Sequence, residues 1–238
     1  MEKDKKIVVM QPYFLPYYGY FQLIKSADIF VVFDDVNYIN RGWINRNRIL
    51  VNGADDFITI PLSKASQNKL IKDIEISQDG EVFKKKMLEK IRHAYKKAKY
   101  FSDVFPIIEK IFLFQEKDLT IYLINSLYEI CKYLEMPFNY VLSSSIKQDE
   151  YNKGQYKIME ICRHLGGKYY INPSGGREMY DAQEFSKNNL ELRFCIPSPA
   201  IYKQFDNEFV PNLSIVDLLM FNSKSQANDF INSYNLIK

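Results

Sequence analysis

The chain has 238 residues, of which 47% are hydrophobic and 26% are charged, the balance of an ordinary globular protein. Its 32 basic and 29 acidic residues give a formal net charge of +3, too small to indicate a nucleic acid or membrane partner unless the basic residues cluster. No apolar run in the sequence is long enough to span a membrane, and the three cysteines follow no metal-binding or disulfide pattern. The first residues lack the apolar segment of a signal peptide, so we expect a cytoplasmic protein without a membrane span.

The chain opens with a predicted strand, loop, helix and strand. A β-branched run at residues 7–10 predicts a buried strand, residues 21–27 a helix with one apolar face, and residues 28–35 a second buried strand. Two strands joined through a helix over about thirty residues form a βαβ unit with parallel strands. Pro12 and Pro16 fix the intervening backbone and remove two donors, so we predict a rigid loop that holds a ligand.

The stretch after the second strand is predicted to be irregular. Residues 36–49 follow neither the period of a strand nor that of a helix, and Gly42 interrupts them, so we expect a loop leading into an edge element. Short strands are predicted at residues 56–61, which a proline ends, and at residues 70–76.

Three amphipathic helices are predicted next, at residues 81–100, 103–114 and 119–134. Asp118 is the expected N-cap of the last one. These helices interrupt the alternation of strands and helices. We therefore predict an α/β core domain formed by residues 1–80 and 136–238, with a helical insertion at residues 81–135.

The alternation resumes after residue 135. Strands are predicted at residues 138–144, 168–172 and 190–196. Helices are predicted at residues 154–165, 181–187, 214–221 and 225–234. This alternation predicts an α/β fold with an open, mostly parallel, Rossmann-like sheet and a helical insertion, in which the carboxyl ends of the strands share one edge.

The opening loop offers the first candidate binding residues. It supplies one amide and four phenols, from Gln11, Tyr13, Tyr17, Tyr18 and Tyr20. Phenols can stack on a base or sugar and hydrogen-bond to its edge. The alternative is that several of these tyrosines only pack the loop onto the core.

Two acids end the second predicted strand. Because adjacent strand residues point to opposite faces, we expect one of Asp34 and Asp35 to face the ligand as general base or substrate anchor. The alternative is a turn acid that accepts hydrogen bonds from backbone amides. With Tyr20, the two aspartates are our candidate catalytic residues.

Residues 41–48 carry three arginines, two asparagines and the only tryptophan of the chain. Arginine forks bind phosphate or carboxylate bidentately, asparagines add neutral donors and acceptors, and tryptophan can stack on a base or sugar. We assign to substrate binding Arg41, Trp43, Asn45, Arg46, Asn47 and Arg48, with Lys64 and Lys69 extending the basic patch. Single-stranded RNA would use the same residue types, so RNA stays open as a partner.

A further candidate anion site follows the strand predicted at residues 168–172. Its Ser-Gly-Gly sequence leaves backbone N–H groups free, although it has neither the Rossmann nor the P-loop spacing. We add to substrate binding Asn172, Ser174, Gly175, Gly176 and Arg177. Both histidines are expected to be structural. The sequence indicates no metal site, and it does not identify a cofactor.

Seven stretches spread over nearly the whole chain belong together: Gln11–Tyr20, Asp34–Tyr38, Arg41–Arg48, Lys153–Gln155, Tyr170–Pro173 with Gly176, Tyr202–Gln204 and Leu213–Asp217. As a set they resemble the WbqC-like family of bacterial surface-polysaccharide gene clusters. This resemblance implies an enzyme that builds or decorates nucleotide-linked sugars.

The first βαβ unit also resembles nucleotidyltransferases of the pantothenate-synthetase type, whose motif is His-x-Gly-His. In this chain Tyr17 and Tyr20 occupy both histidine positions. A phenol can donate to a phosphate oxygen but carries no positive charge at neutral pH, which disfavours adenylyl transfer.

Three hypotheses follow for the function. The leading one is a transferase of O-antigen type polysaccharide biosynthesis that places an acyl or aminoacyl group on a nucleotide-linked amino sugar. In it the loop with Arg41, Arg46 and Arg48, which we call the arginine loop, binds the diphosphate, and Asp34 or Asp35 accepts the amine proton. The alternatives are a nucleotidyltransferase or ATP-dependent activating enzyme, and a non-catalytic module that binds a nucleotide sugar or RNA.

Overall fold

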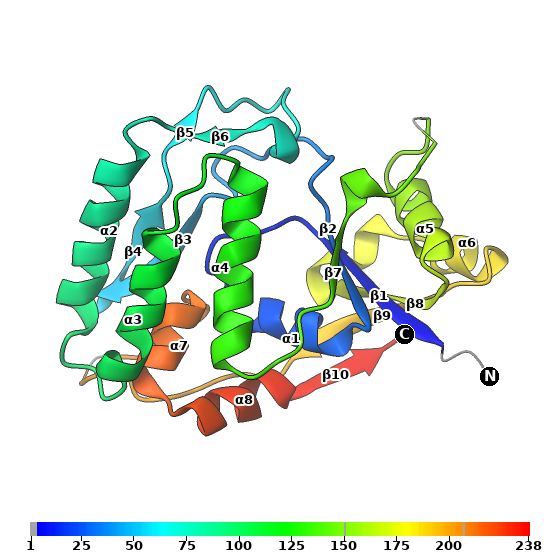
Figure 1. Ribbon diagram of the computed structural model, residues 1–238. Coiled ribbons are helices and arrows are strands. Elements are labelled where there is room, and N and C mark those ends of the chain that lie inside the picture. Colours follow the sequence, from blue (N-terminus) through cyan, green and yellow to red (C-terminus); the bar gives the residue numbers. More distant parts are fainter. Residues whose placement is uncertain (1–3, 150, 207) are drawn as a thin grey trace.

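The computed structural model describes residues 4–149, 151–206 and 208–238, and a six-stranded sheet forms its centre (Figure 1). The strands are β1 (Lys5–Met10), β2 (Ile29–Val32), β7 (Tyr140–Leu142), β8 (Gly167–Pro173), β9 (Glu191–Pro197) and β10 (Tyr234–Ile237). Their order is β10-β9-β8-β1-β2-β7, and within the described ranges only β10 runs antiparallel to its neighbour. The predicted α/β fold with an open, mostly parallel sheet is confirmed.

Helices cover both faces of this sheet. One face packs against α1 (Tyr18–Ser26), α7 (Ile215–Phe221) and α8 (Lys224–Asn232), and the other against α5 (Gln155–His164) and α6 (Ala182–Lys187). The alternation along β1 explains the division, because Val8 belongs to the first apolar cluster and Ile7 and Val9 to the second. In the part of the chain that the structure describes, no helix is both long and apolar enough to cross a membrane.

The three predicted amphipathic helices are present as α2 (Gly80–Tyr95), α3 (Phe101–Phe112) and α4 (Leu119–Tyr133). The Asp118 side chain caps α4 by accepting from the Ile121 amide at 2.9 Å, as predicted. Buried residues of these helices, such as Ile91 and Leu127, belong to the same apolar cluster as Phe21 of α1. The division of the chain into a core domain and a helical insertion stays a prediction.

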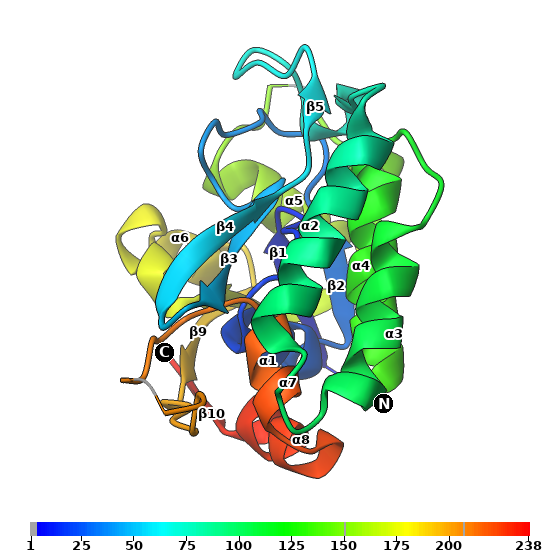
Figure 2. The same ribbon diagram turned by 90° about the vertical axis from the view of Figure 1, so that its left-hand side faces the viewer.

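A small hairpin stands apart from the main sheet. It consists of β3 (Arg46–Val51) and β4 (Ala54–Thr59), and Figure 2 shows it on the side of the molecule that also carries α2 and α7. We expected a loop at residues 36–49, which includes the start of β3. That expectation was wrong because Asn47, a polar residue, is buried in the strand and donates to the Phe14 carbonyl.

Two further expectations need correction. Only β6 (Glu75–Ile76) of the strand predicted at residues 70–76 forms, pairing with β5 (Leu62–Ser63), while η1 (Ile71–Asp73) is a 3₁₀ turn. Ile71 and Ile74 are both buried, and their i, i+3 spacing suits such a turn. The last predicted helix ends at residue 232, and β10 follows it as a half-buried edge strand whose alternation is too weak to stand out in the sequence. Two short 3₁₀ segments, η2 (Ser143–Ser145) and η3 (Ser174–Met179), follow β7 and β8.

Three segments that are distant in the sequence are hydrogen-bonded to one another, and we call their meeting point the three-segment junction. The opening loop bonds to the start of the hairpin, where the Phe14 amide donates to the Trp43 carbonyl and the Asn47 side chain donates to the Phe14 carbonyl, both at 3.1 Å. The start of α7 bonds to both. The Ser214 amide donates to the Arg48 carbonyl at 2.8 Å, and the Ser214 hydroxyl donates to the Leu15 carbonyl at 2.7 Å.

A buried carboxylate, Asp217, fixes the third segment of this junction. It accepts hydrogen bonds from the hydroxyls of Tyr95 and Tyr202, each at 2.8 Å, and from the Gln204 amide at 2.6 Å. The Tyr95 oxygen in turn accepts from the Leu50 amide of β3 at 2.8 Å. This network therefore links α7, the segment before it, α2 and the hairpin.

The Asp217 network predicts a pH dependence of stability. Burial raises the pKa of the Asp217 carboxyl, so the folded protein binds its proton more tightly than the unfolded chain does. Stability from this group is present below about pH 4, the ordinary range of an aspartic acid, and is lost as the pH rises through the higher folded pKa. Asp217→Asn removes this loss.

Urea unfolding of both proteins between pH 4 and 7 measures the effect. We expect the unfolding free energy of Asp217→Asn, relative to the original protein, to rise with pH and then level off. A difference that does not change with pH would contradict the account.

Candidate functional site

Predicted binding residues from two distant parts of the chain line one cleft of about 340 Å³, which we call the Trp43 cleft. The predicted residues in its wall are Tyr13, Tyr17, Trp43, Asn47 and Arg48, and Pro16 and Asn212 complete it. The three-segment junction is the reason that these residues meet, because each of its three segments contributes to the wall. Sequence reasoning missed Asn212. Its φ of 56° places it in the left-handed region that asparagine tolerates, and it directly precedes a stretch that resembles the family.

The Tyr-x-Gly-Tyr sequence directs one phenol to the cleft and the other to the core. The Tyr17 ring folds back over Gly19, where an added Cβ would lie 2.5 Å from the ring, so glycine is what allows this position. Tyr20 is 1% exposed, and its hydroxyl donates to the Gln11 backbone carbonyl at 2.8 Å. Burial raises the pKa of Tyr20 well above its usual value. The Tyr20 ring therefore packs between the opening loop and the sheet, away from the cleft.

Arg48 supplies the positive charge of the Trp43 cleft. Its guanidinium forms an ion pair with Asp55 at 3.1 Å and lies 5.5 Å from the centre of the Trp43 ring. The Nε atom of Arg48 is buried and has no hydrogen-bond partner among the described residues. An arginine has five N–H donors in a fixed plane, so this side chain retains donor capacity for an anionic ligand.

Trp43 supplies a planar apolar surface beside that charge. Its side chain is 39% exposed, and its ring stacks against Phe57 of β4 with the centroids 6.4 Å apart. Contacts with Phe57 and Arg48 of the hairpin and one backbone bond to the opening loop therefore position the ring while leaving part of it open. Such a surface suits a base or a sugar ring.

Arg46 and Asn45, also in this stretch, stabilise the conformation of the loop. The Arg46 guanidinium donates to the backbone carbonyls of Arg41 and Gly42 and lies 4.5 Å from the Phe57 ring centre. Asn45 accepts from the Tyr38 hydroxyl and donates to the Ile60 carbonyl, each at 2.8 Å. Neither residue lines the Trp43 cleft.

The predicted lysines lie apart from this cleft. Lys64 lines a separate cleft with Glu75 and residues at the start of α2, and Lys69 is half-buried in the preceding loop, where its carbonyl accepts from the Tyr38 amide at 2.9 Å. Neither lysine lines the Trp43 cleft, so neither adds its positive charge to that of Arg48 there.

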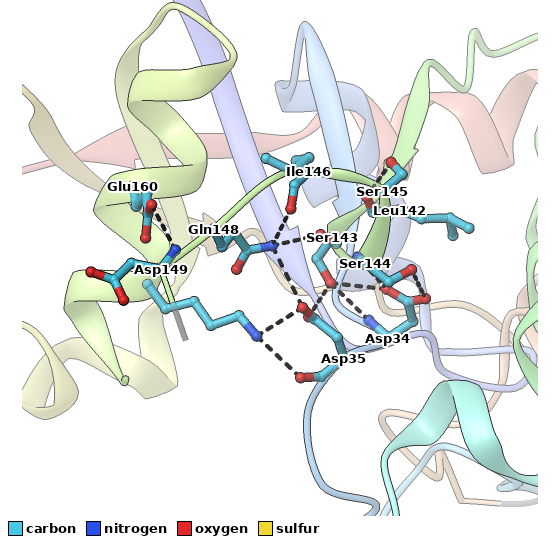
Figure 3. A network of polar contacts seen from close by, with 11 residues as sticks. Asp34, Asp35, Leu142, Ser143, Ser144, Ser145, Ile146, Gln148, Asp149 and Glu160 are labelled. Carbon is cyan, nitrogen blue, oxygen red and sulfur yellow. Dashed lines mark hydrogen bonds and ion pairs between the residues drawn. The ribbon is translucent and has the colours of Figure 1, made fainter. Parts of the chain in front are cut away.

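Asp34 is enclosed by hydrogen-bond donors (Figure 3). It is 1% exposed, and its carboxylate accepts from the Ser143 hydroxyl at 2.9 Å, from the Ser144 amide at 3.0 Å and from the Ser144 hydroxyl at 2.6 Å. These donors all belong to η2, which follows β7. The bond from the Ser144 amide fits the alternative that the sequence left open, a turn acid that accepts from backbone amides, and the two hydroxyl donors were not foreseen.

Asp35 has a different environment, as Figure 3 also shows. Its carboxylate forms an ion pair with Lys157 of α5 at 2.9 Å and accepts from the Ser143 hydroxyl and the Gln148 amide. Lys157 also donates to the Asp35 carbonyl at 3.1 Å. Sequence reasoning missed Lys157, although the family-like stretch Lys153–Gln155 just before it was a signal.

This pair lines a second cleft of about 550 Å³, which we call the Asp35 cleft. Phe33, Asn37 and Tyr180 also line it, together with residues at the start of α5. It has no lining residue in common with the Trp43 cleft. The aspartates and the arginine loop, which sequence reasoning combined in one site, therefore belong to different parts of the described surface.

The predicted Ser-Gly-Gly site lies in η3 at the end of β8. Asn172 is 5% exposed and accepts from the Tyr170 hydroxyl at 3.3 Å. A Cβ on Gly176 would lie 2.1 Å from the Asn172 side-chain nitrogen, so glycine is needed for this packing. Arg177 lies over the Phe194 ring at 5.3 Å, and Ser174 and Gly175 belong to the same turn.

The environment of Asp34 predicts that its replacement affects folding. Asp34→Ala leaves the hydroxyl and the backbone amide of Ser144 without their acceptor, while the Ser143 hydroxyl keeps Asp35, so we expect a loss of about 3 kcal/mol in the free energy of unfolding. Asp73→Ala, at an exposed aspartate, is the matched control and should change it by less than about 0.5 kcal/mol. Chemical denaturation measures both. Equal stability of the two variants would show that Asp34 is not a structural anchor.

Comparisons with known proteins agree with the spread of the family-like stretches. Residues 11–229 match the profile of the WbqC-like protein family. A protein of Mycobacterium tuberculosis (strain ATCC 25618 / H37Rv), described as "Uncharacterized protein Rv1507c", is 28% identical over 231 residues, which cover 95% of this chain and 97% of that protein. No solved structure matches. Because the family profile covers most of the sequence, the chain belongs to the WbqC-like protein family.

Proposed function

We propose that the chain is a transferase of bacterial surface-polysaccharide biosynthesis, of the O-antigen type, that binds a nucleotide-linked amino sugar in the Trp43 cleft. The reaction is the transfer of an acyl or aminoacyl group from an activated acyl donor to the sugar amine. The amine nitrogen attacks the acyl carbon and forms the amide bond, the bond from that carbon to the carrier of the donor breaks, and the carrier leaves. The observation that carries the binding part is the Arg48 guanidinium, whose side chain lines the cleft, is 28% exposed and lies beside the partly open Trp43 ring.

The chemistry of the cleft supports this class of ligand. A diphosphate offers oxygen acceptors to a guanidinium, and a sugar or base offers a flat face to an aromatic ring. The phenols of Tyr13 and Tyr17 line the same cleft and supply hydroxyl groups. Burial raises the pKa of both phenols, so they donate hydrogen bonds as neutral groups.

Within this proposal Asp35, and not Asp34, is the aspartate available to accept the amine proton, which requires the bound amino sugar to extend from the Trp43 cleft to the Asp35 cleft. The Asp34 carboxylate is already occupied by three donors of η2 and is buried. Asp35 borders a cleft and has Lys157 as a counter-charge. A cytoplasmic location is part of the proposal, which is supported by three cysteines that are free and buried.

The contacts of Tyr20 argue against the nucleotidyl-transfer alternative. One of the two phenols in the histidine positions donates to a backbone carbonyl inside the fold, so it does not reach the Trp43 cleft. RNA binding would need a run of basic side chains, whereas Arg46 is folded onto its own loop and Lys64 borders a different cleft.

Because Trp43 is the only tryptophan, its fluorescence reports on ligands in this cleft. Titration with UDP-, dTDP- and GDP-linked amino sugars should give a saturable change. Arg48→Gln should weaken the binding by about tenfold or more, since a hydrogen bond to a charged group is worth about 1.5 to 3 kcal/mol.

Arg163→Gln, at an exposed arginine of α5, is the control and should bind as the original protein does. Saturable binding of ATP with Mg²⁺ and none of the nucleotide sugars would overturn the proposal. Equal affinities of the two arginine variants would overturn the role of Arg48.

A further inference from the structure

A further cleft, of about 500 Å³ and mainly apolar, adjoins the Trp43 cleft, and we call it the Pro199 groove. Tyr17 and Asn212 line both clefts and form their common wall. The rest of the groove is mainly apolar, with Tyr18, Pro197, Pro199, Ile201, Phe209 and Pro211. Of its described lining residues none is charged, so the charge of Arg48 lies on one side of Tyr17 and apolar surface on the other.

The Pro199 groove is held open by rigid parts. The prolines fix φ, and the Tyr18 hydroxyl donates to the Ser198 carbonyl at 3.0 Å. Tyr17 and Tyr18 meet edge to face with their ring centres 5.5 Å apart. Ile201 is 72% exposed beside these rings. The structure thus maintains apolar surface in contact with water, next to a cleft with unused donors.

We propose that the two clefts form one bipartite site for an anionic ligand that carries a hydrocarbon chain. The phosphate head binds at Arg48 in the Trp43 cleft, and the chain lies past Tyr17 in the Pro199 groove. In the reaction proposed above, on which this assignment of the chain rests, the hydrocarbon is the acyl group joined to the sugar amine. The ligand that fills both clefts is then the acylated product, and the groove limits the length of the acyl group that can be transferred.

The shared wall favours a single ligand over two separate ones. A molecule that contacts both sides of Tyr17 gains the charge-assisted bonds of Arg48 and the burial of apolar surface together. Small-molecule sites commonly combine an apolar lining with a few placed polar groups, as these two clefts do in combination.

A series of alkyl phosphates tests the site without a nucleotide. Inorganic phosphate and butyl, hexyl and octyl phosphate are titrated against Trp43 fluorescence. Burial of one methylene contributes enough free energy to raise affinity about fourfold, so affinity should rise by about that factor per methylene until the groove is filled. Affinity independent of chain length would overturn the proposal.

Two variants separate the arms of the site. Ile201→Asn should lower the gain per methylene while leaving the affinity for inorganic phosphate unchanged. Arg48→Gln should lower the affinity for every member of the series by the same factor. Val82→Asn, at an exposed apolar residue of α2, is the control for Ile201→Asn and should behave as the original protein. A gain per methylene that Ile201→Asn does not alter would place the chain elsewhere and overturn the proposal.

The outcomes also separate this inference from the proposed function. If nucleotide sugars bind and alkyl chain length has no effect, the proposed function stands and the bipartite site is wrong. If chain length acts through Ile201 and no nucleotide sugar binds, the bipartite site stands and the nucleotide sugar is the wrong head group.

Discussion

The hydrogen bonds of the three-segment junction determine where the candidate ligand surface lies. They join the opening loop, the β3–β4 hairpin and the start of α7, which are far apart in the chain. The buried Asp217 holds the last of these through two tyrosines and a glutamine. Because buried polar groups must be paired, these contacts specify one arrangement of the three segments. The Trp43 cleft is a consequence of that arrangement, and the Pro199 groove adjoins it through the shared residues Tyr17 and Asn212.

The sheet edge contributes a second, separate surface. Parallel strands bring Gln11, Asp34 and Asn172 to the same edge, because the first two follow the carboxyl ends of β1 and β2 and Asn172 lies near that of β8. At this edge Asp34 and Asn172 are buried and engaged in packing, while Asp35 and Lys157 border a cleft. Adjacent aspartates just after β2 thus have different environments, Asp34 buried among donors of η2 and Asp35 at a cleft.

Sequence reasoning reached the fold and part of the cleft for physical reasons. The amphipathic helices and buried parallel strands have clear periods, and the cleft residues Trp43 and Arg48 have side chains unusual in a plain loop. It could not separate Arg48 from Arg46, because the guanidinium of Arg46 turns back onto its own loop. Asn212 and Lys157 each lie beside a family-like stretch, but their roles depend on contacts between distant segments, which the sequence does not show. We did not predict the edge strand β10, because its weak alternation of apolar and polar residues gives no clear period.

The central claim is that Arg48 and Trp43 bind the anionic and planar parts of one ligand. A crystal structure of the chain with a UDP-linked amino sugar tests it most directly. We expect diphosphate oxygens within hydrogen-bond distance of the Arg48 guanidinium, with the sugar or base against the Trp43 ring. A ligand bound only in the Asp35 cleft, with no contact to Arg48 or Trp43, would contradict it.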